Sequence, residues 1–375
     1  MRIRRIRNIT FYFSYFVIVG LLIFTILEVA ASVILRKRVE NSLSIFNGIA
    51  QSGQNVLEIK PYCDLRWKEA EFSVSIRTNS RGYREDFEFE DGRVDVAFMG
   101  DSFTFGHGVD VLTRYSNVAA RQHPNLTIVS LAYNNGFQPE HYEYFLDRHP
   151  ELRPKVLFVG LYLGNDLDDD VIETLIERDK YGKIAKLELP YKDVYQGVLI
   201  NRSNYRYEWF SKLVEVASLG KVVAARINSS HRLRRIFVRE RKLTNEGNKL
   251  STGFGNLDQI NLRAIRSLMN IAEMSEMRGG VLHVLLIPQN FLVGYVQNPH
   301  VAPDNRYRLD EIRAKYVLMK AVLKLCQNNG LKCHDLSRIL TTDDYFESDG
   351  HWNEQGHEKV GRYSSEIIAR TLVEN

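Results

Sequence analysis

Cysteine is scarce in this sequence, with only three among 375 residues. Three cysteines cannot form the dense disulfide framework of a small secreted scaffold, and none has the Cys-x-x-Cys or Cys/His spacing that binds structural zinc. Cys326 and Cys333 lie seven residues apart, where a predicted helix passes into a predicted strand. A disulfide between them and two buried free thiols both fit this position, and Cys63 is left over in either case.

Repeats and a general excess of charge are also absent. The chain is 44% apolar and 26% charged, with 24 Gly and 9 Pro, which excludes collagen-like and wholly disordered proteins. The net charge is +4, but residues 1–38 alone contain seven Lys/Arg and one acid. The other 337 residues contain 43 basic and 45 acidic side chains, so we predict no nucleic-acid partner.

An uncharged stretch near the N-terminus stands apart from the rest. Residues 9–27 carry no charge, and extending the stretch to residue 35 adds only Glu28. About 20 apolar residues cross a bilayer, whereas the apolar part of a cleaved signal peptide has about 7–15. We therefore predict that residues 1–38 are a single-pass transmembrane anchor, with residues 9–35 in the lipid bilayer; cleavage near Ala30-Ala31-Ser32 is the weaker alternative. Four Arg precede the stretch and three Lys/Arg follow it, which favours a cytoplasmic N-terminus and an extracytoplasmic body.

The remaining chain alternates short apolar runs with segments of helical period. Helical patterning is found in segments such as Pro139–Arg148 and Arg308–Asn328. This alternation predicts an α/β fold, a three-layer structure with a doubly wound parallel sheet, in which ligands bind at the carboxyl ends of the strands. Five apolar runs suit strands that are buried on both faces: Val94–Met99, Leu126–Tyr133, Lys155–Leu163, Gly280–Pro288 and Leu331–Leu336.

One connection between predicted strands is far longer than the about 30 residues of a βαβ unit. Within it, residues 205–227 have helical patterning and residues 229–242 are rich in Arg. We interpret residues 173–255 as a helical insertion or lid. The Arg-rich helix is either a solvated face or a surface for an anionic lipid or polymer. The predicted core then comprises residues 94–172 and 256–375, and residues 39–93 form an N-terminal extension packed on it.

The first predicted strand ends in a serine between glycines, in the segment Gly100-Asp101-Ser102-Phe103-Thr104-Phe105-Gly106. A serine at the start of a helix has a free backbone N–H and a dipole that favours a developing anion. Its hydroxyl is a weak nucleophile and requires a base. The alternative is that Asp101 and Ser102 only cap the helix.

Two further segments carry polar side chains of the kind found in catalytic sites. The third strand ends in Gly164-Asn165-Asp166, where the Asn165 amide can donate to an oxyanion or simply close an Asx turn. Three more Asp follow at 168–170, but adjacent carboxylates point in different directions, so we predict no metal site. Near the C-terminus, Asp349-Gly350-His351 places an acid two residues before a histidine, the usual general base near neutral pH.

Together, these three segments resemble the SGNH/GDSL hydrolase superfamily, whose flavodoxin-like core binds substrate at the strand ends. The resemblance implies Ser102 as nucleophile, His351 as base and Asp349 as the acid that orients it. It implies an oxyanion hole made by the Ser102 N–H, Gly136 and Asn165, with Asp101 in support and no cofactor or metal. Thr78-Asn79-Ser80-Arg81-Gly82-Tyr83-Arg84 also resembles a segment that precedes the first block in membrane-anchored bacterial members.

The sequence departs from the family pattern at two places. The acid and base of the family are usually spaced Asp-x-x-His, whereas this chain has Asp349-x-His351 followed by Trp352. This shorter form resembles members that act on bacterial polysaccharides. In the second block, Asn135 stands where a glycine is usual, and Gly136 follows one residue later.

The resemblance implies a membrane-anchored serine esterase that forms an acyl-enzyme on ester groups, including O-acetyl groups of envelope or exported polysaccharide. Two alternatives stay open. One is an O-acetyltransferase with the same triad. The other is a non-catalytic protein that binds glycans on this scaffold, with Trp67, Trp209 and Trp352 as stacking platforms.

Overall fold

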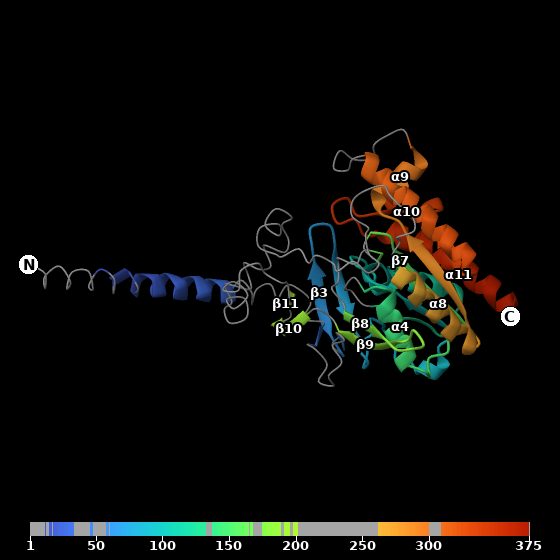
Figure 1. The fold of residues 1–375 in the computed structure, drawn as a ribbon, viewed down its shortest axis with the longest axis horizontal. Helices are drawn as coiled ribbons and strands as arrows, with labels where there is room; N and C mark the ends of the chain where they lie inside the picture. The colour runs from blue at the N-terminus through green and yellow to red at the C-terminus, as the bar shows by residue number, and fades with distance from the viewer. Residues whose placement is uncertain are drawn as a thin grey trace, which may run out of the picture. The chain divides into compact units, whose positions relative to one another are not determined.

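The computed structural model describes most of the body and parts of the N-terminal region (Figure 1). The chain divides into two compact units, residues 1–49 with 190–243, and residues 50–189 with 244–375. The described residues are 12, 15–16, 18–33, 46–47, 58–59, 61–132, 137–164, 166–167, 175–188, 191–195, 198–201, 262–299 and 309–374.

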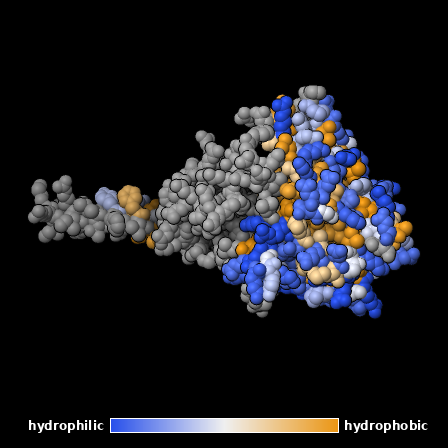
Figure 2. Space-filling model, turned by 45° about the vertical axis from the view of Figure 1, so that its right-hand side comes forward, coloured by the Kyte–Doolittle hydropathy of each residue, from blue (hydrophilic) through white to orange (hydrophobic). Residues whose placement is uncertain are grey.

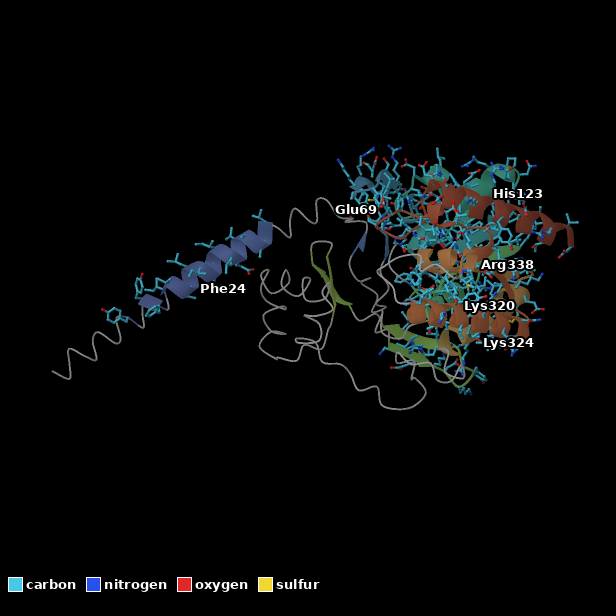
Figure 3. The ribbon with its side chains drawn as sticks, turned by 90° about the horizontal axis from the view of Figure 1, so that it is seen from above. Phe24, Glu69, His123, Lys320, Lys324 and Arg338 are labelled. Atoms are coloured by element: carbon cyan, nitrogen blue, oxygen red, sulfur yellow. A yellow bond between two sulfur atoms is a disulfide. The ribbon has the colours of Figure 1, made fainter. Side chains whose placement is uncertain are left out.

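The first unit contains, among its described residues, a helix and three short strands. Residues 18–33 are helical, as are Tyr12, Tyr15 and Phe16, and Phe24 lies on this helix (Figure 3). Its apolar side chains are largely exposed; Leu21, for example, is 62% exposed. In the part of the chain that the structure describes, no helix combines the length and the apolar character needed to cross a membrane, so the predicted span over residues 9–35 is not confirmed. The unit also contains β1 (Phe46–Asn47) and an antiparallel hairpin of β10 (Tyr191–Tyr195) and β11 (Val198–Asn201).

The second unit is built on a five-stranded parallel sheet with the order β13-β12-β7-β5-β6. All five predicted strands are present, although each is somewhat shorter than its apolar run. In chain order, the first strand of this sheet lies between the second and the third, as in flavodoxin-like folds, where ligands bind at the point at which the strand order reverses. The strands are β5 (Val96–Met99), β6 (Ile128–Ser130), β7 (Val156–Tyr162), β12 (Val281–Ile287) and β13 (Lys332–Asp335).

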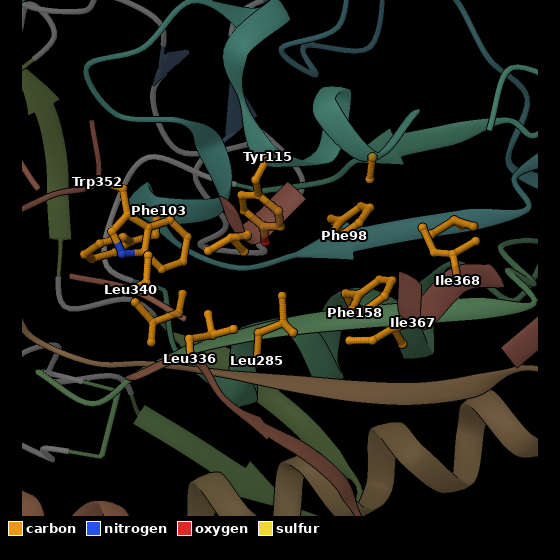
Figure 4. Packing of buried hydrophobic residues seen from close by; sticks show 14 of the residues in the cluster. Phe98, Phe103, Tyr115, Phe158, Leu285, Leu336, Leu340, Trp352, Ile367 and Ile368 are labelled. Atoms are coloured by element: carbon orange, nitrogen blue, oxygen red, sulfur yellow. The ribbon is translucent and has the colours of Figure 1, made fainter. Parts of the chain in front are cut away.

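Helices pack on this sheet in two groups. In one group, α3 packs against α11, and Figure 4 shows Tyr115 and Ile367 from these two helices in one apolar cluster with Phe98 and Phe158 from the strands. In the other, α4 packs against α8, which contacts β12, while α10 contacts β13. The described helices are α2 (Ser102–Phe105), α3 (Tyr115–Gln122), α4 (Pro139–Arg148), α8 (Leu262–Met277), α9 (Asn290–Gln297), α10 (Leu309–Asn328) and α11 (Glu354–Glu374).

The apolar runs form the sheet because they can be buried on both faces. Every residue of β5 is buried, and so are six of the seven residues of β7. Phe98 and Phe158 stack on neighbouring strands with ring centroids 4.6 Å apart. Burial of large side chains of this kind stabilises a fold by about 1.5–3 kcal/mol each. The face of the molecule seen in Figure 2 is mostly hydrophilic where residues are coloured, as expected for a surface in contact with water.

The N-terminal extension contributes a β-hairpin to this unit. β3 (Asp64–Lys68) and β4 (Ser73–Arg77) pair antiparallel, and the two-residue strand β2 spans Glu58–Ile59. Short 3-10 turns lie at 91–93, 111–113, 336–338 and 342–344. Arg84, just after the hairpin, is buried and binds backbone carbonyls at the end of α2 and in the loop after it, so this part of the extension packs on the core.

The predicted insertion begins with strands. β8 (Leu175–Arg178) and β9 (Ile184–Glu188) form an antiparallel hairpin whose Arg178 pairs with Glu143 of α4. The two segments predicted as helices, 205–227 and 229–242, lie outside the described residues. The described part of the insertion, up to residue 201, therefore contains β-hairpins, which the interpretation as a helical insertion did not include.

The structure distinguishes the two alternatives for the cysteines. Cys326 at the end of α10 and Cys333 in β13 form a disulfide, with their Cα atoms 6.0 Å apart. Cys63 is free and buried.

Candidate active site

Ser102 lies at the carboxyl end of β5, as its sequence context predicted. It is the first residue of α2, and Asp101 before it is the N-cap, whose carboxylate accepts the Phe103 N–H at 3.0 Å. The short helix lies very close to the strands. A Cβ at Gly100 would approach Thr104 Oγ1 to 2.0 Å. The glycine before Asp101 therefore permits this tight strand-to-helix turn and the position of Ser102 in it.

Ser102, His351 and Asp349 converge, although the serine and the histidine are 249 residues apart. Ser102 Oγ lies 2.8 Å from His351 Nε2, which is hydrogen-bond distance. The other ring nitrogen, Nδ1, bonds to Asp349 Oδ1. The spacing Asp-x-His thus brings acid and base together.

The loop that carries Asp349 is fixed by Glu71, in the turn between β3 and β4. The Glu71 carboxylate accepts the backbone N–H groups of Glu347, Ser348 and Asp349 at 2.7, 3.0 and 3.1 Å. It also accepts the Ser348 hydroxyl. Hydrogen bonds to a charged acceptor are stronger than neutral ones. A residue from the N-terminal extension thus holds the loop that presents the acid and the base.

A second histidine, His107, completes the surroundings of Asp349. Its Nε2 lies 3.3 Å from Asp349 Oδ2, the oxygen that does not face His351. Its ring stacks on the ring of His351 with centroids 4.0 Å apart and an interplanar angle of 18°. Trp67 and Phe72 of the β3–β4 hairpin contact His107 edge-on, at centroid distances of 4.4 and 5.3 Å.

Buried charged side chains fix the backbone of the loop that follows Ser102. The Arg84 guanidinium donates to the carbonyls of Gly106 at 2.7 Å and Val109 at 2.6 Å, on both sides of His107. Arg114 pairs with Glu85 at 2.7 Å, with both side chains 1% exposed. Because Arg84 ends the segment 78–84 that resembles family members, its contacts give that segment a physical role: it fixes the loop after Ser102.

The electrostatics of the site favour a neutral imidazole. Burial lowers the pKa of His351, and the hydrogen bond to Asp349 opposes this only in part. Partial burial tends to raise the pKa of Asp349, but hydrogen bonds from His107 and His351 outweigh it and keep that pKa below its usual range. Asp349 therefore stays ionised, while His351 is free to accept a proton at neutral pH.

Two buried carboxyl groups lie close to the serine. Burial raises the pKa of Asp101 to about 7. Burial, together with repulsion from Asp101, also raises the pKa of Asp166 well above its usual range. Asp166 accepts the Tyr162 N–H at 2.8 Å, which closes the turn at the end of β7.

The other two predicted oxyanion residues, Gly136 and Asn165, lie outside the described residues, as do Asp168–Asp170. Gly164 and Asp166, the neighbours of Asn165, follow β7, the strand adjacent to β5 in the sheet. The Ser102 N–H belongs to the first turn of α2, where backbone donors have no acceptor within the helix.

Two groups of described side chains have donor atoms within 4.8 Å of one another, close enough to share a metal ion. The first is His107, Asp349 and His351, where an ion would displace the hydrogen bond that orients His351. The second comprises Asp91, His149 and Glu151, where Asp91 is already bound by Arg81. The predicted absence of a metal and of a cofactor stays a prediction.

Glu71 and His107 were not predicted as site residues. His107 had a weak local signal, because it lies five residues after Ser102 between two glycines of positive φ, Gly106 at 83° and Gly108 at 78°. Such a turn presents its central side chain at a fixed place. Glu71 had no local signal, since its role depends on a hairpin meeting a loop 276 residues later.

Comparison with protein-family models and with curated proteins found no match. Among solved structures, the chain is similar to a member of the lipolytic G-D-S-L family from Veillonella parvula, at 10% identity and a TM-score of 0.34, covering 73% of this chain and 98% of that one. It is also similar to a putative lipolytic G-D-S-L protein from Desulfitobacterium hafniense, at 11% identity and a TM-score of 0.35, covering 72% and 98%. A third similar structure is a putative acylhydrolase from Bacteroides fragilis, at 12% identity and a TM-score of 0.33, covering 74% and 87%.

Two of these three structures are described as G-D-S-L proteins, the family that the motifs of this sequence resemble. The chain thus resembles the SGNH/GDSL superfamily in its motifs, and solved members of that family are among the structures similar to it.

Proposed function

We propose that this protein is a serine esterase that works through an acyl-enzyme. The observation that carries the proposal is the continuous chain of contacts from Ser102 Oγ to His351 Nε2, at 2.8 Å, and from His351 Nδ1 to Asp349. A hydroxyl, an imidazole and a carboxylate in this order are the recurring arrangement of serine hydrolases on unrelated folds. Their position at the reversal point of the sheet is where ligands bind in this architecture.

The chemistry follows from this geometry. His351 accepts the proton of Ser102 as the serine oxygen attacks the ester carbonyl, and Asp349 stabilises the imidazolium that forms. His351 then donates that proton to the leaving alcohol as the tetrahedral intermediate collapses to the acyl-enzyme. A water molecule, deprotonated by the same His351, releases the acid and restores Ser102.

The negative oxygen of the intermediate needs donors, and the Ser102 N–H is one of them. Gly136 and Asn165 are the proposed second and third donors, from their positions after the second and third strands of the sheet. Loss of one such donor typically costs about 10²–10³ in kcat. Replacement of Asn165 by alanine should therefore leave a reduced but measurable activity, whereas Ser102→Ala should approach the uncatalysed rate.

The proposed substrates are esters, in particular O-acetyl groups of envelope or exported polysaccharide. This narrower assignment is supported by the Asp-x-His-Trp form of the last motif. Transfer of the acyl group to a sugar hydroxyl instead of water uses the same intermediate. Acetate release measured beside acetyl transfer to a glycan, with one donor ester, separates hydrolase from transferase.

Glycan binding without catalysis receives no support from the described tryptophans. Trp352 is 0% exposed and packs on Phe103 and Tyr115, and Trp67 is 6% exposed against His107. Neither side chain offers a face on which a sugar can stack. Trp209 lies outside the described residues.

The test of the proposed esterase is labelling by a fluorophosphonate together with turnover of p-nitrophenyl acetate. Wild-type protein should be labelled at Ser102 and should hydrolyse the ester, and Ser102→Ala should lose both. Ser365→Ala, a serine on α11 that bonds to His123, is the matched control and should behave as wild type. Equal labelling of Ser102→Ala and wild type would end the assignment.

An N-terminal membrane anchor with an extracytoplasmic body is part of the same proposal. Its support is the uncharged sequence from 9 to 27 with Arg before it, and the Cys326–Cys333 disulfide, a bond typical of oxidising compartments. Full-length protein should stay in the membrane fraction after alkaline carbonate and should be cut by protease added on the extracytoplasmic side of the membrane. Release by carbonate, or protection from the protease, would contradict this location.

A further inference from the structure

The loop after the nucleophile brings a second imidazole to the triad, and this imidazole has a built environment. His107 is 13% exposed at its side chain and lies between the His351 ring and the edge contacts of Trp67 and Phe72. Its backbone is fixed from both sides, because Arg84 binds the carbonyls of Gly106 and Val109. A side chain so confined has one orientation, and that orientation directs Nε2 at Asp349.

The two oxygens of Asp349 are thus divided between two rings. Oδ1 accepts from His351 and Oδ2 lies 3.3 Å from His107 Nε2. A carboxylate bound at both oxygens cannot rotate away from the base it serves. The stack of the two rings, 4.0 Å between centroids, also limits rotation of His351 itself.

We propose that His107 is a positioning residue for the reaction: it holds Asp349 at the oxygen opposite His351 and stacks on the His351 ring, so that His351 keeps the orientation needed to take the Ser102 proton. This inference rests on the proposed function, since it assigns a role in the same proton transfer.

The effect of His107 on the basicity of His351 has a definite direction. The charged and titratable groups around His351 are Asp349 from its own loop, His107 from the loop after α2, Asp101 from the β5–α2 connection, Glu71 from the β3–β4 hairpin and His357 from α11. Asp349 favours the imidazolium at 351. His107 disfavours it, because it binds the same carboxylate and brings a ring that carries positive charge when protonated. Removal of His107 should therefore make His351 more basic.

A purely structural role for His107 makes a different prediction. If the ring only fills the space between Trp67 and His351, a phenyl group of similar shape replaces it at little cost. His107→Phe keeps the stack and the packing but removes the donor, whereas His107→Gln keeps an N–H donor and loses the ring. The two variants therefore separate the hydrogen bond from the packing.

The experiment measures kcat and KM for p-nitrophenyl acetate from pH 5 to pH 9 in wild type, His107→Phe and His107→Gln. Loss of one hydrogen bond to a charged group predicts about a tenfold to hundredfold fall in kcat for His107→Phe, with little change in KM. The acid limb of kcat/KM should move to higher pH by about half a unit to one unit. His107→Gln should recover part of kcat. His123→Phe, which removes a histidine that joins α3 to Ser365 of α11, is the matched control and should change neither value.

A second readout does not depend on activity. NMR titration of the His351 ring in full-length protein should give a higher pKa in His107→Phe than in wild type. If wild type turns over no ester and is not labelled at Ser102, the esterase proposal fails, and the titration still decides whether His107 acts on His351. If His107→Phe leaves the His351 titration and the acid limb where wild type has them, the positioning role is wrong, whether kcat falls or not.

Discussion

Replacement of Asp349 by asparagine tests the triad most directly. The aspartate has two oxygens, and each faces an imidazole nitrogen, from His351 and from His107. An asparagine has one oxygen and one NH2 group, so one of the two rings must face a donor instead of an acceptor. Where the NH2 group faces His351, it stabilises the tautomer with hydrogen on Nε2, which cannot accept the Ser102 proton.

The size of the loss depends on how well water can replace the carboxylate. In serine proteases with a buried acid, the same change costs about 10⁴ in kcat. Here the Asp349 and His351 side chains are 28% and 22% exposed, so solvent compensates part of the missing interaction. We expect a loss of about 10²–10³, which corresponds to about 3–4 kcal/mol in the barrier.

The interaction with His107 adds a second expectation. In a His107→Phe background, the amide oxygen introduced by Asp349→Asn has only one ring to serve and can turn toward His351. The fold loss caused by Asp349→Asn should then be smaller than in the His107 background, so the two substitutions should not be additive.

The assay is kcat/KM for p-nitrophenyl acetate, together with the rate of fluorophosphonate labelling at Ser102. Thermal unfolding of each variant controls for loss of fold, and Asp343→Asn, an exposed aspartate six residues earlier, controls for the change of charge. A loss below tenfold for Asp349→Asn, with Ser102 still required, would show that His351 does not depend on this carboxylate and would refute the triad.

Three further predictions concern the surroundings of the site. Glu71→Gln should lower kcat about tenfold, since three backbone N–H groups and a hydroxyl lose an ionised acceptor, while Glu276→Gln on α8 should not; equal kcat values would remove Glu71 from the site. The acid limb of wild-type kcat/KM should lie below pH 6.5, because burial lowers the pKa of His351 and the neutral ring is the active form; a limb above 7 would contradict this. Reduction of Cys326–Cys333, which closes a short loop, should cost about 2 kcal/mol of stability, or about 4 °C in melting temperature, and leave kcat/KM unchanged; loss of activity before unfolding would be the contrary result.

The sheet and the convergence of Ser102, His351 and Asp349 could be predicted because they depend on local patterns. Continuous apolar runs such as Val156–Tyr162 are buried on both faces only in a parallel sheet under two layers of helices. The side chains that follow the strands must then meet at one edge, which is why Ser102 and His351 converge from distant segments. The helix from Pro139 to Arg148 was predicted at its observed bounds, since proline starts it and the apolar period is regular.

The hairpin of β8 and β9 was missed although its turn has a recognisable signal. Asp179-Lys180-Tyr181-Gly182 has a glycine at φ 81°, and Asp179 accepts the N–H of Tyr181 at 2.8 Å and of Lys183 at 3.0 Å. Such a turn between two short apolar runs favours antiparallel strands. The length of the connection favoured an inserted helical subdomain, whereas the chemistry of this turn favours the observed hairpin.

The roles of Glu71 and His107 could not be predicted, for a different reason. Neither residue belongs to a motif, and each acts through a surface that exists only after folding. The sequence around Glu71 shows only a carboxylate in a hairpin turn, because the three N–H groups that it binds belong to a distant loop. The spacing of Asp349 and His351 can be recognised in the sequence, but the roles of Glu71 and His107, which hold this pair, cannot.

The hydrogen bonds between Glu71 and the loop at 347–349 affect the order in which the parts of the proposed active site form during folding. The hairpin that carries Glu71 is synthesised early, whereas the residues that the Glu71 carboxylate binds come about 280 positions later in the chain. Contacts of such long range close after local ones, because the chain must first lose the entropy of the intervening loop. Refolding protein should thus regain its secondary structure well before it regains the capacity to react at Ser102.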